Sequence, residues 1–250
     1  MTPAEILARA KSAGVDLVVH IGTDVASSRF GVELSRSHPS VRSAVALHPN
    51  EAPEIALASG QSGLDLAISE IESLANSPLV SAIGETGLDF FRTGAEGRPH
   101  QEHSFREHIR IAKSVAKPLV VHDRDAHTQI LDILAETKPP IVVLHCFSGD
   151  EAIAKECVAR GYYISFAGNV TFKNSESLRA ALQVVPLDQL LVETDAPFLT
   201  PMPYRGKTNS SYLIPLIIDA IAGVRNESSE DLARATWQNT LQIFGDSPSS

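Results

Sequence analysis

The chain has 250 residues, with 21 Lys and Arg against 30 Asp and Glu, and 43% of its residues are hydrophobic. The formal charge of −9 excludes a broad basic nucleic-acid surface and a polybasic membrane patch, and no apolar run approaches the ~18 residues that cross a bilayer. Because the start lacks the layout of a secretory signal and two cysteines are too few for a disulfide framework, we expect a soluble, cytoplasmic α/β protein.

The predicted elements begin with a helix at the N-terminus. Thr2 offers a capping hydroxyl, Pro3 suits the first turn, and Glu5 stands three positions after the cap. The apolar stripe of this helix follows at Ile6, Leu7 and Ala10.

Seven short runs rich in β-branched residues then recur along the chain. Near-continuous apolar runs of this length are typical of strands covered on both faces, as in a parallel sheet. The runs occupy residues 15–21, 41–47, 79–84, 119–122, 141–145, 162–167 and 190–195.

Helical patterns separate these runs. Residues 63–75 place their apolar side chains on one face, residues 101–116 and 126–137 show comparable spacing, and residues 150–160 end before Gly161, a natural C-cap. No Ser/Gly linker, charge block or low-complexity tract interrupts the series. We therefore expect a single domain over residues 1–245 and a frayed tail over residues 246–250.

The alternation of strand and helix predicts a TIM-like (β/α)₈ barrel. A closed barrel needs eight strands and seven are visible, so in this fold the first strand is missing from the chain. An open, doubly wound sheet is the alternative, because it can have seven strands and needs no closure. However, no Gly-rich phosphate loop follows the first visible strand.

Ionisable side chains fall at the carboxyl ends of the predicted strands. The mouth formed by these ends holds the active site of barrel enzymes, so side chains that converge there indicate a functional site. They are His48, Glu85, His122, His145 and Asp195.

Four of these residues form a set of nitrogen and oxygen ligands suited to a hard or borderline divalent cation, namely Glu85, His122, His145 and Asp195. Each alone has an ordinary explanation, since a histidine at a strand end is often only hydrogen-bonded and an Asp before Pro often forms a turn. Taken together they favour metal ligation. Strand alternation predicts that Cys146 points away from His145.

Four runs carry a resemblance to a known family. Residues 84–89, 122–126, 145–149 and 193–197 resemble the motifs of the TatD family of metal-dependent deoxyribonucleases, a branch of the amidohydrolase-like barrels, in the same order and spacing. The resemblance implies a TIM-like barrel and one or two divalent metal ions (Mg²⁺, Mn²⁺ or Zn²⁺). It also implies hydrolysis of DNA phosphodiester bonds, typically from a 3′ end.

Carried over residue by residue, the resemblance implies that Glu85, His122, His145 and Asp195 are metal ligands, with Glu85 bridging two ions. Asp195 and Glu85 are then the catalytic residues, and Asp195 orients the attacking water and accepts its proton. Glu193 lies two positions before Asp195 on the same strand face. It is either a partner of a ligand or a paired acid in the barrel interior.

The chain departs from the family pattern in two places. Most members begin with a strand that carries His-x-His and supplies two more ligands, and this chain has no such strand. The family often reads Asn-Glu-Pro after a basic stretch, whereas here Asn209 is followed by Ser210 and Ser211.

Three further residues are candidates for binding the substrate. The guanidinium fork of Arg124 suits a phosphate, and a salt bridge to Asp123 or Asp125 is the alternative. Arg205 offers a cation on the loop after the last strand. His48, at the start of the loop after the second predicted strand, is also expected to bind the substrate.

The expected partner is DNA, as a short single-stranded end, because the charge of −9 disfavours a wrapped duplex. We expect a monomer that does not bind membranes. Aromatic residues near strand ends are candidates for stacking on bases, although each also suits the core. They are Phe90, Phe91, Phe147, Phe172 and Phe198.

Two other functions stay open from the sequence. The same site in an amidohydrolase-like barrel could act on an ester or an amide. Alternatively, the chain is an inactive metal-binding relative because the first strand is absent, or its true start lies upstream.

Overall fold

The computed structural model describes residues 1–245, and the expected tail at 246–250 lies outside the described residues. The chain forms two compact units. The first, here called the β1–β5 unit, is Val19–Val143; the second, the β6–β7 unit, combines Met1–Val18 with Leu144–Ile243. Within residues 1–245, no helix is both long enough and apolar enough to span a bilayer.

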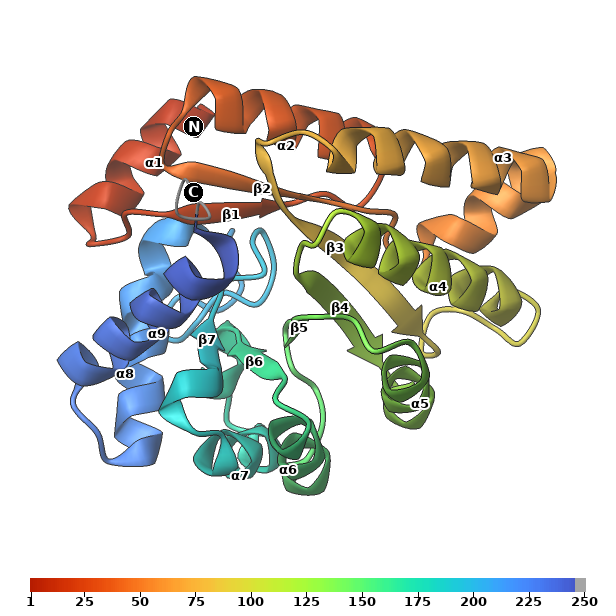
Figure 1. Ribbon diagram of the computed structural model, residues 1–250. Helices are drawn as coiled ribbons and strands as arrows, with labels where there is room; N and C mark the ends of the chain where they lie inside the picture. The colour runs from red at the N-terminus through yellow and green to blue at the C-terminus, as the bar shows by residue number, and fades with distance from the viewer. Residues whose placement is uncertain (246–250) are drawn as a thin grey trace. The chain divides into compact units, whose positions relative to one another are not determined.

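In the β1–β5 unit, neighbouring strands follow the order of the chain. The β2–β3 and β3–β4 pairs are parallel. Figure 1 shows the helices of this unit along one side of its strands. The strands are β1 (Val18–Ile21), β2 (Val41–Val45), β3 (Val80–Asp89), β4 (Leu119–Arg124) and β5 (Val142–Leu144). The helices are α2 (Val25–Ser37), α3 (Glu51–Ala75), α4 (Arg98–Ser114) and α5 (His127–Thr137).

In the β6–β7 unit, strands β6 (Tyr163–Phe166) and β7 (Leu190–Val192) pair in parallel. Helix α1 (Pro3–Ser12) packs on the short helix η3 (Ser211–Leu213). The other helices are α6 (Glu151–Ala159), η1 (Gly168–Thr171), α7 (Glu176–Val184), η2 (Leu187–Gln189), α8 (Ile214–Arg225) and α9 (Ser229–Phe244).

The predicted N-terminal helix is confirmed with its cap. The backbone N–H of Glu5 donates to the Thr2 hydroxyl, and the Thr2 N–H donates to the Glu5 carboxylate at 2.7 Å, which closes a capping box. The helix predicted at residues 63–75 is longer than expected. It begins at Glu51 and is interrupted at Gly60, whose φ of 70° breaks the helical path.

Strand β3 also exceeds its prediction, because it continues past residue 84 to Asp89. Glycines allow this continuation by letting β3 approach β4. Gly87 pairs with His122, and a Cβ atom at Gly87 would lie 2.0 Å from the His122 carbonyl oxygen. Its φ of 148° also favours glycine. Glu85 therefore lies inside the strand, between close backbones, and not at the strand's end as predicted.

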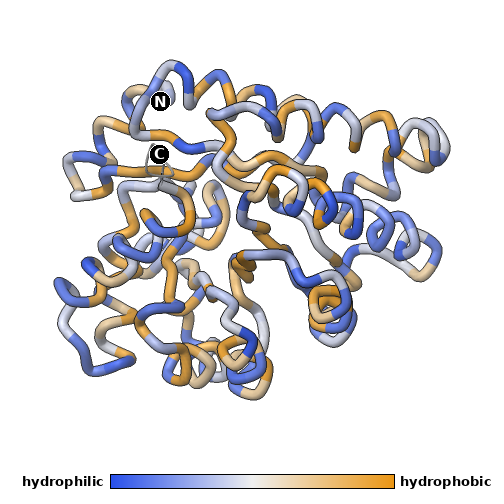
Figure 2. Tube along the Cα trace, in the orientation of Figure 1, coloured by the Kyte–Doolittle hydropathy of each residue, from blue (hydrophilic) through white to orange (hydrophobic). Residues whose placement is uncertain are grey.

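The core consists of apolar strand residues and the inward faces of the helices. Figure 2 shows hydrophobic residues concentrated along the strands and hydrophilic ones on the outer turns of the helices. His108 of α4 is a fully buried exception. Its Nδ1 hydrogen-bonds the Ser104 carbonyl at 2.7 Å, and its Nε2 accepts the Leu47 N–H at 3.0 Å. The ring is therefore neutral and joins α4 to the segment after β2.

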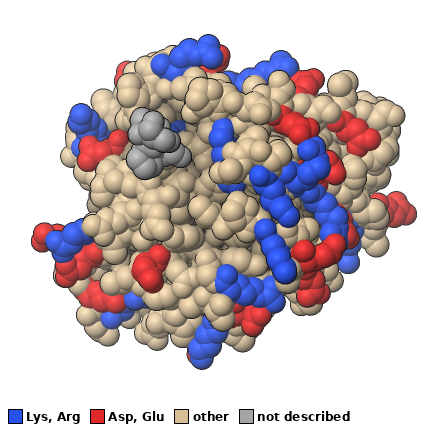
Figure 3. Space-filling model, in the orientation of Figure 1, with Lys and Arg blue, Asp and Glu red and all other residues tan. Residues whose placement is uncertain are grey.

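Ion pairs join neighbouring helices across the outer surface of the β1–β5 unit. Figure 3 shows basic and acidic side chains side by side on this face. The pairs are Arg29–Glu70 at 2.6 Å, Arg110–Glu72 at 2.8 Å and Arg106–Glu136 at 2.9 Å. These three cations therefore already have acidic partners.

Candidate metal centre

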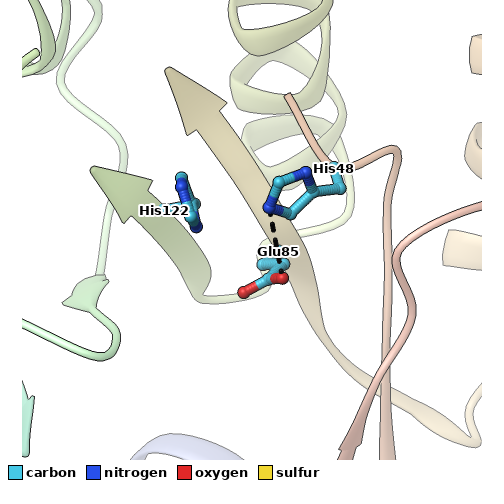
Figure 4. Close-up of side chains that lie close together, drawn as sticks. All are labelled: His48, Glu85 and His122. Atoms are coloured by element: carbon cyan, nitrogen blue, oxygen red, sulfur yellow. Dashed lines mark ion pairs between the residues drawn. The ribbon is translucent and has the colours of Figure 1, made fainter. Parts of the chain in front are cut away.

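Three side chains of the β1–β5 unit converge beside the carboxyl ends of its strands. Glu85 comes from β3, His122 from β4, and His48 from the segment that follows β2. Figure 4 shows the three pointing toward one another. Each offers one ligand atom, and these atoms all lie within 4.8 Å of one another. The cluster includes two of the four predicted ligands, Glu85 and His122, and adds His48.

The chemistry of the cluster suits a divalent cation. His48 Nε2 lies 3.6 Å from Glu85 Oε1, and the rings of His48 and His122 meet edge to face with centroids 4.5 Å apart. All three side chains are mostly buried. A carboxylate oxygen with imidazole nitrogens is the donor set that Zn²⁺ and similar borderline ions prefer, so these residues fit such a metal.

The backbone of Asn50 fixes the proton on His48. The Asn50 N–H donates to His48 Nδ1 at 3.1 Å. A neutral imidazole that accepts at Nδ1 carries its proton on Nε2. His48 therefore directs an N–H toward Glu85, and binding a metal through Nε2 would break the contact with Asn50.

Asp89 lies behind His122 and was missed by the sequence reasoning. Its carboxylate is 1% exposed, and its Oδ2 lies 3.4 Å from His122 Nε2 and 3.1 Å from Asn50 Nδ2. Its Oδ1 accepts the Arg92 N–H at 2.8 Å. Burial alone would raise the pKa of Asp89, but hydrogen bonds from His122, the Arg92 backbone and Asn50 hold it well below its usual range. The charged carboxylate is thus available to orient His122.

A buried network stabilises this arrangement. The Asp89 N–H donates to Gln101 Oε1 at 3.0 Å, and Gln101 Nε2 donates to Thr93 Oγ1 at 2.7 Å. Thr93 Oγ1 in turn donates to Asn50 Oδ1 at 3.0 Å. The network connects α4, the loop after β3 and the segment after β2, so the residues behind the cluster hold one another in place.

The other two predicted ligands belong to the β6–β7 unit. His145 follows β5 directly, and its Nδ1 lies 3.1 Å from Glu193 Oε1. Burial would raise the pKa of Glu193, but attraction to His145 and hydrogen bonds from His145, Ser165 and the Cys146 backbone lower it. In the neutral form of the His145 ring, a hydrogen bond from Nδ1–H to the charged Glu193 carboxylate places the lone pair of the ring on Nε2, the nitrogen that would bind a metal. Of the two explanations for Glu193, the geometry favours the partner of a ligand.

Asp195 lies in the segment after β7, in the left-handed region with φ of 55°. The Cys146 sulfur lies 3.9 Å from Asp195 Oδ2. The basis for expecting Cys146 to point away from His145 is absent, because β5 ends at Leu144 and Cys146 itself has a φ of 44°. Strand alternation does not apply to a left-handed residue after the strand.

Asn209 anchors the segment that carries Asp195. Its side-chain Nδ2 donates to the carbonyl oxygens of Thr194 at 2.7 Å and Phe198 at 2.6 Å. Its backbone N–H donates to the Pro197 carbonyl at 3.1 Å. The loop is held by the one residue that keeps the family's pattern there.

The predicted substrate cations are exposed and stack on aromatic rings. The guanidinium of Arg124 lies 4.3 Å from the ring centroid of Phe91, and that of Arg205 lies 4.2 Å from Phe172. Arg124 makes no ion pair with any residue from 1 to 245, and the alternative partner Asp123 contacts His127 at 2.8 Å. Arg124 is therefore available to a ligand.

Strands that alternate with helices, with carboxylate and imidazole side chains gathered beside the strand ends, define a metal-dependent hydrolase of the TIM-like barrel class. The comparisons give the family. A family model described as "TatD related DNase" matches residues 1–245, and the chain belongs to this family. The resemblance drawn from the four motifs is confirmed.

Relatives agree with this assignment along nearly the whole chain. An "Uncharacterized metal-dependent hydrolase TatD" of Mycobacterium tuberculosis is 40% identical over 98% of this chain and 91% of its own. A "3'-5' ssDNA/RNA exonuclease TatD" of Cronobacter turicensis is 38% identical over 96% of this chain and 90% of its own. The crystal structure of YJJV, a TatD homologue from Escherichia coli K12, matches with a TM-score of 0.86 and 26% identity, covering 96% of this chain and 91% of that one. The predicted TIM-like barrel fold, with seven strands visible, is confirmed.

Proposed function

We propose that the protein is a metal-dependent 3′–5′ exodeoxyribonuclease that acts on single-stranded DNA ends. Glu85, His122, His145 and Asp195 are its metal ligands. The observation that carries the proposal is the convergence of Glu85 and His122, two of these ligands, in a cluster with His48 whose three candidate ligand atoms lie within 4.8 Å of one another. The printed name of the Cronobacter relative, an exonuclease on single-stranded DNA and RNA, supports the choice of substrate.

The residues divide the work of hydrolysis between them. A bound divalent ion supplies positive charge for the phosphate and lowers the pKa of water, to about 7 in the best zinc cases. Asp195 orients the attacking water and accepts its proton, and the Glu85 carboxylate binds the metal. His48 donates a hydrogen bond from Nε2–H to a phosphate oxygen, because the Asn50 contact keeps the proton on that nitrogen. Arg124 and Arg205 contact phosphates of the strand.

The surface charge favours a substrate that contacts only a small area of the protein. Ion pairs across α2–α5 occupy Arg29, Arg106 and Arg110, and the net charge is −9. Affinity for DNA then depends on the metal and on the few cations beside it, which suits one unpaired end better than a duplex. We propose that residues 1–245 act as one monomeric domain in the cytoplasm. Neither of the chain's two cysteines is in a disulfide, in keeping with a reducing compartment.

The test uses protein stripped of metal and then given Mg²⁺, Mn²⁺ or Zn²⁺ with 5′-labelled single-stranded DNA. We expect stepwise loss of 3′ nucleotides that requires metal and is abolished in Asp195→Asn. His103→Gln serves as a control, because His103 pairs with Asp65 on the outer helices. Hydrolysis of ester or amide substrates without loss of nucleotides would refute the nuclease assignment, and no metal-dependent hydrolysis at all would identify an inactive relative.

A further inference from the structure

We propose that Phe91 and Arg124 form a stacking platform for one unpaired nucleobase beside the metal centre. The inference rests on the proposed nuclease function and adds the part of the substrate that is recognised. Phe91 is 63% exposed although it is a large apolar residue. The Arg124 guanidinium lies 4.3 Å from its ring centroid, so a cation supports the ring while much of its surface stays open.

The turn that carries Phe91 is fixed to the cluster through Asp89. One carboxylate oxygen of Asp89 accepts the Arg92 N–H at 2.8 Å, and the other lies 3.4 Å from His122 Nε2. The Thr93 N–H also donates to the Asp89 carbonyl at 3.2 Å. One buried residue therefore sets both the place of Phe91 and the orientation of His122.

Arg124 is fixed to the same cluster through β4. It stands two positions after His122, so both side chains leave the same face of the strand. The Phe90 N–H donates to the Arg124 carbonyl at 2.9 Å, which continues the pairing of β3 with β4 up to the platform. Arg124 thus belongs to the same pair of strands as Glu85 and His122, and Phe91 lies in the turn that follows β3.

The two groups match two parts of one nucleotide. The open ring of Phe91 presents an aromatic face, on which any base can stack. The stacked guanidinium of Arg124 keeps its N–H edge for a phosphate, since within residues 1–245 it forms no ion pair. A base inside a duplex has both faces covered by its neighbours. The platform therefore selects an unpaired nucleotide, whatever its base.

An open cavity of about 680 Å³ begins at Arg92, the residue after Phe91, and offers room for the strand to continue. The loop that follows Phe91 forms one wall of this cavity. Its lining is Asn50, Pro53, Glu54 and residues 92–97.

The test compares two 5′-fluorescein oligonucleotides, dT8 and the same strand with abasic residues at its two 3′ positions, by fluorescence anisotropy in EDTA at low salt. Wild type is expected to bind dT8 roughly 5- to 160-fold more tightly than the abasic strand, the range that base–aromatic stacking gives. Phe91→Ala and Phe91→Leu should lose this preference, because leucine keeps apolar bulk without a ring. Phe91→Trp should keep it. Phe30→Ala is the matched control, since Phe30 is 52% exposed on α2.

Two results would overturn the platform: equal binding of both strands by wild type, or a preference that is unchanged in Phe91→Ala because both strands lose affinity equally or not at all. Release of 3′ nucleotides with Mn²⁺ is measured separately. A preference without release refutes the nuclease function and leaves the platform, whereas release without a preference refutes the platform alone.

Discussion

The backbone N–H of Asn50 lies 3.1 Å from Nδ1 of His48 and donates a hydrogen bond to it. His145 has the opposite arrangement, because its Nδ1 faces the Glu193 carboxylate at 3.1 Å. The first ring therefore presents an N–H at Nε2, and the second presents a lone pair. Two histidines that look alike in the sequence therefore differ in their hydrogen bonds, which suits the proposed roles of His48 as a hydrogen-bond donor and of His145 as a metal ligand.

This difference predicts how loss of His48 separates activity from metal binding. His48→Ala should lower kcat/KM for single-stranded DNA by about 100-fold, the typical loss when one transition-state donor is removed. The dissociation constant for Mn²⁺ should stay within about threefold of wild type by titration calorimetry. Loss of a residue that hydrogen-bonds a metal ligand weakens metal binding by about 10-fold or more, so a smaller change would show that His48 does not hold the metal. His48→Gln keeps an N–H donor and should recover part of the rate. A fall in metal affinity that parallels the fall in rate would show that His48 is a ligand.

Arg124→Gln should weaken binding of single strands uniformly across base sequences. A phosphate contact releases about one counterion, so the slope of log affinity against log salt should become shallower by about 0.7. Arg110→Gln removes an arginine whose partner is Glu72, and it should leave the slope unchanged. An unaltered slope in Arg124→Gln would exclude the phosphate contact.

Gly87→Ala should destabilise the fold by at least about 2 kcal/mol, because the new Cβ would meet the His122 carbonyl oxygen at 2.0 Å and φ is 148°. Gly94→Ala is the control, since a Cβ there meets nothing within 4 Å. Urea unfolding measures both. Equal stability of the two variants would contradict the close approach of β3 to β4.

His108 gives a dependence of stability on pH. Burial lowers the pKa of His108 to about 4 from its ordinary 6.5. As the pH falls below about 6.5, the unfolded chain takes up a proton that the folded protein binds only near pH 4. Folding stability is therefore lost across this window, by of the order of 3 kcal/mol. The difference between wild type and His108→Gln in urea unfolding should shrink as the pH is lowered from 7 to 4, and a constant difference would refute this assignment.

The fold could be predicted largely from the sequence, because the apolar runs and helical spacings report local structure directly. Details that depend on neighbouring strands could not. The alternation of apolar residues did not predict that β3 continues to Asp89. This continuation depends on the close approach of Gly84 and Gly87 to β4. Likewise the direction of Cys146 follows from a left-handed backbone that no residue pattern announces.

The candidate site shows the same division. Glu85, His122, His145 and Asp195 could be selected because ionisable residues that follow apolar runs are conspicuous, although Glu85 lies inside β3. Asp89 could not, since a single aspartate gives no sign that it is buried against His122. Its alternation with Glu85 and Gly87 along β3 was the one available signal.

The central claim is that Glu85, His122, His145 and Asp195 hold the metal, and metal titration of stripped protein tests it most directly. We expect Glu85→Gln, His122→Gln, His145→Gln and Asp195→Asn each to weaken Mn²⁺ binding by more than ~10-fold, while circular dichroism shows each variant folded. Ten-fold is the smallest loss of metal affinity expected when a residue that only hydrogen-bonds a ligand is removed. His103→Gln should bind as wild type does. If any one of the four folded variants keeps the wild-type affinity, that residue is not a ligand and the claim fails.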